Sequence, residues 1–131
     1  MTNKELSQFY YLKKEIRSYQ QKIKELESRS TYCSNLITGL PNASNITDRV
    51  GKYAIQLANI KCLLNLEIKK CLRELDKLER YIEEVDDSLV RQIIMYRFII
   101  CYNWRKTAQI IGGNNKPESL RKKLYRYLKT H

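Results

Sequence analysis

Few side chains in this 131-residue chain are suited to catalysis or metal binding, and they lie far apart in the sequence. The sole histidine, His131, is the last residue, so no Ser-His-Asp or Cys-His arrangement is predicted. The four cysteines, Cys33, Cys62, Cys71 and Cys101, lack the short spacings of a zinc site. We expect them to be buried, reduced thiols, as in a cytosolic protein. The chain is therefore not expected to be an enzyme or to hold a metal or cofactor.

An acidic cluster is the second group that could do chemistry, because paired carboxylates can act as general acid and base. It consists of Glu79, Glu83, Glu84, Asp86 and Asp87. The cluster falls at the end of a predicted helix, and Asp87-Ser88 is suited to cap the helix that follows. This position favours a structural role.

Basic residues give the strongest functional signal. The formal net charge is +11, and ten of the basic residues follow Ser88, where Glu118 is the only acid. Such a concentration is typical of a nucleic-acid-binding region attached to a nearly balanced scaffold. A solvated basic helix face and an acidic protein partner are the alternatives.

Three short helices are predicted to position these basic residues. The first, Leu89 to Ile100, is apolar on too many sides for a surface helix. The second begins after a capping Asn103 and ends at Gly112-Gly113, because glycine adopts the left-handed conformation at low cost. Pro117 fits the first position of the third. The pattern predicts a helix-turn-helix module.

The last helix has two different sides. Leu120, Leu124, Tyr127 and Leu128 are expected to face the core, together with Trp104 and Ala108 of the preceding helix. The opposite side is basic, as major-groove docking requires. Lys123 lies nearer the core edge and is expected to contact a phosphate or to extend its stem along the protein. The predicted DNA-binding residues are Arg105, Lys106, Lys116, Glu118, Ser119, Arg121, Lys122, Lys123, Tyr125, Arg126 and Lys129.

The preceding part of the chain predicts two long helices. Apolar residues at alternating spacings of three and four run through 3–29, starting at a cap by Thr2 or Asn3. A second seam runs from Thr47-Asp48 to Glu84, with one break where Ile60, Leu64 and Ile68 are spaced by four and four. Residues 30–47, rich in Ser, Thr, Asn, Gly and Pro, are expected to form a loop. We predict an all-α fold with a long antiparallel, coiled-coil-like hairpin in residues 1–86 and a three-helix helix-turn-helix module in 87–131. Because so thin a hairpin leaves apolar surface uncovered, a homodimer through it is expected.

No signal peptide or membrane span is recognised in the sequence, so we expect a cytoplasmic protein with no membrane partner.

Residues 89–129 resemble region 4 of sigma-70-type factors. The resemblance rests on the segments Ile93-Ile94-Met95-Tyr96-Arg97-Phe98, Asn103-Trp104-Arg105-Lys106-Thr107-Ala108 and Ser119-Leu120-Arg121-Lys122-Lys123-Leu124. The whole chain is similar to small regulators of Gram-positive phages and prophages, including ArpU- and RinA-like late-gene activators. The resemblance implies sequence-specific binding of double-stranded DNA, transcription regulation, a contact with RNA polymerase and a location in the cytoplasm of a bacterial host. The sequence departs from the family in its five-residue turn and in Pro117, which stands where a polar contact residue is common.

Two other functions fit the same elements. A small terminase-like DNA-packaging subunit also combines a helix-turn-helix with oligomerising helices. A region-4-like module could instead bind RNA polymerase or another protein without contacting DNA.

Overall fold

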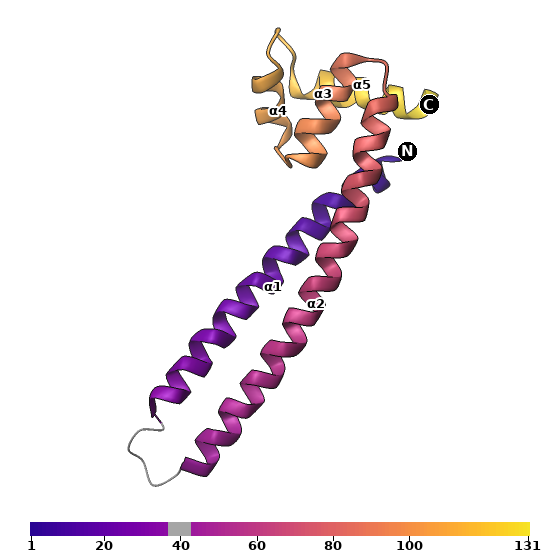
Figure 1. Cartoon of the computed structure of the whole chain (residues 1–131). Helices are drawn as coiled ribbons and strands as arrows, with labels where there is room; N and C mark the ends of the chain where they lie inside the picture. Colours follow the sequence, from indigo (N-terminus) through magenta and orange to yellow (C-terminus); the bar gives the residue numbers. More distant parts are fainter. Residues whose placement is uncertain (37–42) are drawn as a thin grey trace. The chain divides into compact units, whose positions relative to one another are not determined.

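The computed structural model describes the backbone of residues 1–36 and 43–131, and the side chains of 1–29 and 48–131. All of the described elements are helical: α1 (Asn3–Leu36), α2 (Ala43–Glu84), α3 (Ser88–Ile94), η1 (Met95–Ile99), α4 (Trp104–Ile111) and α5 (Pro117–Thr130). Figure 1 shows the long N-terminal helix pair and the shorter C-terminal helices. The predicted all-α class is confirmed.

The start of α1 is fixed by a reciprocal hydrogen-bonded cap. The backbone N–H of Glu5 donates to Thr2 Oγ1 at 3.4 Å, and the Glu5 carboxylate accepts from the backbone N–H of Thr2 at 2.6 Å. This capping box satisfies two N–H groups that a helix start otherwise leaves open. It also lowers the pKa of Glu5, first through the backbone and then through the side chain of Thr2.

The predicted loop over 30–47 is too long. α1 continues to Leu36 and α2 already begins at Ala43, while residues 37–42 lie outside the described residues. The Ser, Thr and Asn residues that follow Arg29 weaken a helix only slightly. Stronger helix breakers, Gly39 and Pro41, come later in the sequence.

The chain divides into two compact units. One, here called the terminal unit, combines residues 1–13 with 70–131, and the other, the hairpin unit, covers 14–69. This division differs from the predicted boundary between residues 86 and 87, because the first turns of α1 and the last turns of α2 belong with α3 to α5.

The hairpin unit consists of two antiparallel helices (Figure 1). The predicted apolar seam is the less exposed side of both: Leu26 is buried, and the other seam residues are half-buried, namely Ile16, Tyr19, Ile23, Tyr53, Leu57, Ile60, Leu64 and Ile68. An ion pair between Lys61 and Glu27, 3.6 Å apart, joins the two helices beside the seam.

The terminal unit holds most of the buried apolar side chains. They come from α1, α2, the turn that follows α2, and the short elements α3, η1, α4 and α5: Leu6, Phe9, Cys71, Leu78, Val85, Val90, Ile93, Ile94, Phe98, Ala108, Leu120 and Leu124. Within this unit, the C-terminal stripe of α2 is thus covered by the other segments. The prediction that all thiols are buried is confirmed for Cys71 but wrong for Cys62, which is exposed, and for Cys101, which is half-buried; Cys33 lies outside the described side chains.

The helix predicted from Leu89 to Ile100 changes its winding before it ends. α3 passes into a π-helical turn, η1, where the Ile100 N–H donates to the Met95 carbonyl at 3.0 Å. Cys101 then adopts a left-handed φ of 67°. This turn ends the core helix and directs the chain into α4.

None of the helices among the described residues combines the length and apolar character needed to cross a membrane.

Candidate nucleic-acid interface

α4 is the first helix of the predicted helix-turn-helix, and both of its ends are fixed by local chemistry. The Asn103 side chain accepts a hydrogen bond from the Lys106 N–H at 2.8 Å, and Thr107 Oγ1 donates to the Asn103 carbonyl at 2.9 Å. Thr107 and Ala108 are buried, while Trp104 is half-buried. The predicted Asn103 cap and inward face are confirmed.

The turn after α4 is held by its own hydrogen bonds. Gly112, Gly113 and Asn114 adopt left-handed φ values of 69°, 67° and 59°. The Asn115 side-chain amide donates to the Gly112 carbonyl at 2.9 Å, and the Asn115 backbone N–H donates to the same oxygen at 3.4 Å. The long turn therefore has a defined geometry, which sets where α5 begins.

α5 begins with Pro117 at its first turn, as predicted, and has no side-chain cap. Lys116 precedes it in an extended conformation with a ψ of 148°. The first N–H groups of a helix have no partner within the helix. The N–H groups of Glu118 and Ser119, at the positive end of the helix dipole, are therefore suited to an external anion.

The two sides of α5 differ as the sequence predicts. Leu120 and Leu124 are each 1% exposed and anchor the helix in the terminal unit. Tyr127 and Leu128 are half-buried on the same side. The other predicted interface residues of α5, apart from Lys123, are exposed: Glu118, Ser119, Arg121, Lys122, Tyr125, Arg126 and Lys129.

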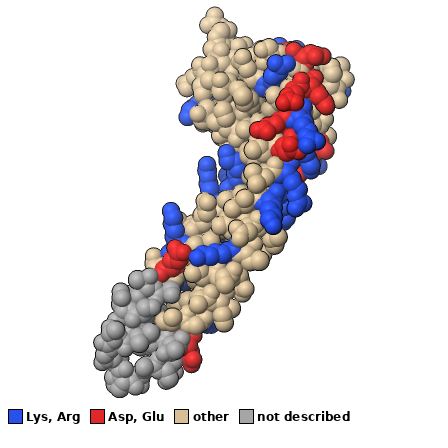
Figure 2. Space-filling model, viewed as in Figure 1, with Lys and Arg blue, Asp and Glu red and all other residues tan. Residues whose placement is uncertain are grey.

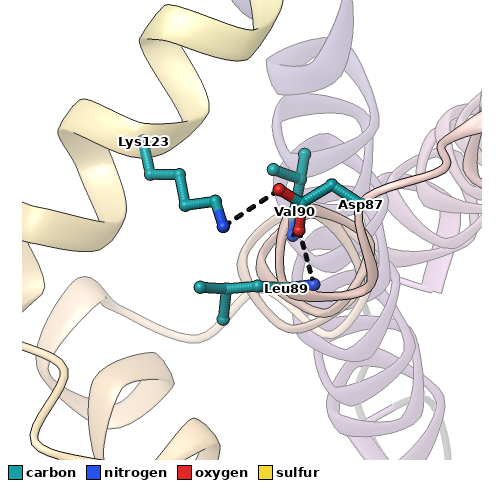
Figure 3. Close-up of polar contacts among 4 residues, drawn as sticks. All are labelled: Asp87, Leu89, Val90 and Lys123. Carbon is teal, nitrogen blue, oxygen red and sulfur yellow. Dashed lines mark hydrogen bonds and ion pairs between the residues drawn. The ribbon is translucent and has the colours of Figure 1, made fainter.

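Lys123 has a different role from the one the sequence suggested. Its ammonium lies 2.9 Å from Asp87 Oδ2 (Figure 3). The other oxygen of Asp87 accepts from the N–H groups of Leu89 at 2.9 Å and Val90 at 3.2 Å, which caps α3. The pKa of Asp87 is lowered, chiefly by the hydrogen bond from Lys123. Lys123 thus joins α5 to the start of α3, and we exclude it from the interface.

Three further predicted residues lie before α5, and all three are exposed. Lys106 places its ammonium 4.0 Å from the centre of the Tyr102 ring, a cation–π contact. Arg105 and Lys116 line a surface depression of about 410 Å³ with polar side chains of α4 and the turn, Gln109, Asn114 and Asn115. These amides are not among the residues predicted from the sequence, although the Asn-rich composition of the turn indicates them.

Arg97 is the other important residue that was not assigned from the sequence. Its guanidinium donates to the Tyr102 carbonyl at 3.1 Å. It lies 5.5 Å from the centre of the Trp104 ring and 5.8 Å from that of Tyr10. Because it is partly buried against these rings, Arg97 supports the start of α4 and is not available as an interface cation.

Charge is distributed unequally within the terminal unit. Figure 2 shows acidic side chains gathered around the end of α2. Two basic residues there are paired, Lys77 with Glu74 at 2.6 Å and Arg80 with Asp76 at 2.9 Å. Within the described part of the chain, by contrast, the exposed basic residues of α5 have no acidic partner within 4.0 Å. The α5 surface is therefore the part of this unit best suited to a polyanion.

Comparison of the chain with protein-family models, with curated proteins and with solved structures finds no match.

Proposed function

We propose that the chain binds double-stranded DNA through α5 and regulates transcription. The observation that carries the proposal is the pairing of a buried apolar side, Leu120 and Leu124, with an exposed basic side on one helix. A recognition helix needs both: a rigid seat on its own protein and cations that reach the nucleic acid.

The positions along α5 suggest how the contacts are divided. Ser119 and Lys122 lie in the first half of the helix and Arg126 and Lys129 in the second. Residues near the start of a recognition helix reach base edges in the major groove, where Arg and Lys recognise guanine. Arg121 also lies there, and its guanidinium is 5.6 Å from the Tyr125 ring centre, which limits the orientations available to it. Arg126 and Lys129 are assigned to phosphates.

The start of α5 and the preceding turn add phosphate-binding groups. The N–H groups of Glu118 and Ser119 have no side-chain cap, and Lys116 and Arg105 line the adjacent depression. Backbone N–H groups at a helix start and nearby cations are common phosphate ligands in DNA complexes. These phosphate contacts would fix the position of α5 along the DNA groove without recognising the base sequence.

The regulatory part of the proposal rests on the resemblance of residues 89–129 to sigma-70 region 4. It assigns the chain to the phage or prophage type of late-gene regulator, acting in the cytoplasm of a bacterial host and in contact with RNA polymerase. The structure supplies the helical order and the capped turn that this proposal requires.

Fluorescence anisotropy with labelled duplex DNA tests the DNA contact. The triple variant Arg121→Ala, Lys122→Ala, Arg126→Ala should bind at least about 100-fold more weakly, and each lost phosphate contact should reduce the salt slope by about one. A matched triple variant, Arg17→Ala, Lys24→Ala, Lys52→Ala, removes the same charge from exposed residues of the hairpin unit and should bind nearly as the wild type does. Selection from random duplexes then measures sequence preference.

Equal binding by the wild type and the α5 variant would overturn the assignment of α5. A ring of many subunits, measured by native mass, would instead indicate a packaging subunit. Co-purification with RNA polymerase in the absence of any DNA binding would indicate a protein-interaction module.

A further inference from the structure

The outward side of α2 in the hairpin unit lacks the charges expected of a solvent-facing helix. Residues 53–66 contain a single charged residue, Lys61, and its ammonium pairs with Glu27 of α1 beside the seam. In residues 14–29 of α1, by contrast, eight residues are charged. Figure 2 shows an uncharged surface along this part of α2, with charged side chains towards its ends.

Large apolar side chains are exposed on this surface. Ile55 is 66% exposed and Leu66 is 50% exposed, and Cys62 between them is exposed as well. Small residues, Gly51 and Ala58, complete the stripe on the side opposite the seam, since successive helical residues are rotated by about 100°. So much exposed apolar surface without interspersed charge is typical of an interaction site.

We propose that this stripe of α2 binds the same stripe of a second copy of the chain, with the two helices antiparallel. The stripe consists of residues 48, 51, 55, 58, 59, 62, 66 and 69, and its spacing is unchanged when the order is reversed. A symmetric dimer places one surface against the same surface of the second copy. With this palindromic spacing each residue of the stripe faces a stripe residue of the second copy, and each such pair, here called a layer, occurs twice in the dimer.

The chemistry of the layers selects the antiparallel direction. Reversal places Leu66 opposite Gly51 and Ile55 opposite Cys62, so a large side chain meets a small one in both layers. It also places Asp48 opposite Lys69, which pairs unlike charges at both ends of the stripe. A parallel dimer would oppose Asp48 to Asp48 and Lys69 to Lys69, which is unfavourable.

Sedimentation velocity over a concentration series, without DNA, tests the proposal, which does not depend on the proposed function. The wild type should form dimers. The double variant Ile55→Lys, Leu66→Lys should weaken the dimer by at least about 100-fold, because each substitution acts twice in a symmetric interface. The matched variant Tyr11→Lys, Leu72→Lys changes two equally exposed apolar residues of the terminal unit, 56% and 60% exposed, and should dimerise as the wild type does.

Gly51→Leu separates association from folding. A Cβ added at Gly51 meets nothing within 4 Å, and leucine has the higher helix propensity, so the folded chain should become slightly more stable. In the antiparallel dimer the new side chain meets Leu66 of the second copy, so association should weaken about tenfold or more. Far-ultraviolet circular dichroism and thermal unfolding verify that each variant is folded.

A wild type that is monomeric at all concentrations would overturn the proposal, as would a dimer that Ile55→Lys, Leu66→Lys leaves intact. A dimer that Gly51→Leu leaves unchanged or strengthens would overturn the antiparallel register. A stoichiometric complex with a different protein that displaces a second copy from this stripe would also count against it.

Discussion

The two units of the chain use their apolar residues in different ways. The terminal unit buries side chains from all six described helical elements around one core, and α3 and α4 are fixed by the Asp87 and Asn103 caps. In the hairpin unit, Leu26 is the one apolar side chain that is buried among the described residues, and the rest of the seam is half-exposed. Because the terminal unit has a closed core, it can hold a binding helix firmly in place. Two helices alone cannot enclose a core, so the hairpin unit gains most from a partner that covers its exposed apolar side chains.

The largest expected difference between the units comes from removing a buried leucine. Leu124→Ala in the terminal unit should lower the free energy of unfolding by about 2–5 kcal/mol, because Leu124 is 1% exposed and its loss leaves a cavity. Leu57→Ala in the hairpin unit removes the same atoms from a half-buried position and should cost about 1 kcal/mol. Urea unfolding followed by circular dichroism measures both.

Equal costs for the two substitutions would contradict the comparison. The hairpin measurement is made at low protein concentration, because dimerisation would add to the apparent stability of that unit.

Thiol reactivity should show the next largest difference. Burial raises the pKa of the Cys71 thiol in the terminal unit, whereas Cys62 of the hairpin unit is exposed. Since the thiolate is the reactive form and access is also required, Cys71 should react with a maleimide about 10- to 100-fold more slowly than Cys62. Peptide mass spectrometry after timed labelling measures the two sites separately.

Repeating the labelling at several protein concentrations extends the comparison of Cys62 with Cys71. If α2 pairs with a second copy, the reaction at Cys62 should slow as the chain dimerises, while Cys71 should be unaffected. Equal labelling rates at Cys62 and Cys71, with no effect of protein concentration at Cys62, would contradict the difference in side-chain burial between the hairpin unit and the terminal unit.

The sequence predicted the elements that depend on local chemistry. Asn103, Gly112 and Pro117 mark helix ends through their own side chains or backbone preferences, and the structure confirms all three. The division of the two α5 sides also follows from spacing alone, because helical geometry converts sequence position into direction.

Features that depend on contacts between distant segments were not predicted. The pairing of Lys123 with Asp87 and the contact of Arg97 with Tyr10 join residues that are far apart in the sequence. Phe9 fits the periodicity of the hairpin seam, yet it is buried in the terminal unit, because periodicity gives a direction and not a partner. The end of α1 and the start of α2 were misplaced because Ser, Thr and Asn only weaken helices, whereas the predicted start of α1 and end of α2 agree with the structure.

The smallest expected difference concerns one ion pair in each unit. In the terminal unit, Asp87 has a lowered pKa, chiefly because Lys123 donates to it, and it also caps α3. A carboxylate whose pKa is lower in the folded state stabilises the fold above its unfolded pKa, near 3.9, and loses this effect as the pH falls through its folded value. Asp87→Asn keeps a capping side chain but removes the charge, so it should cost about 0.5–1 kcal/mol at pH 7, and this cost should shrink as the pH falls below the unfolded pKa.

The hairpin unit supplies the matched control, the pair of Lys61 with Glu27. These side chains are 53% and 51% exposed and 3.6 Å apart, against 41% and 36% exposed and 2.9 Å for Lys123 and Asp87. Because solvent screens the more open pair and Glu27 lies in the interior of α1, Glu27→Gln should change the free energy of unfolding by no more than about 0.3 kcal/mol at pH 7. Urea unfolding between pH 3 and pH 7 measures both variants against the wild type. Equal costs at pH 7, or a cost for Asp87→Asn that does not decrease between pH 7 and pH 3, would show that the Asp87 charge does not hold α5 to α3.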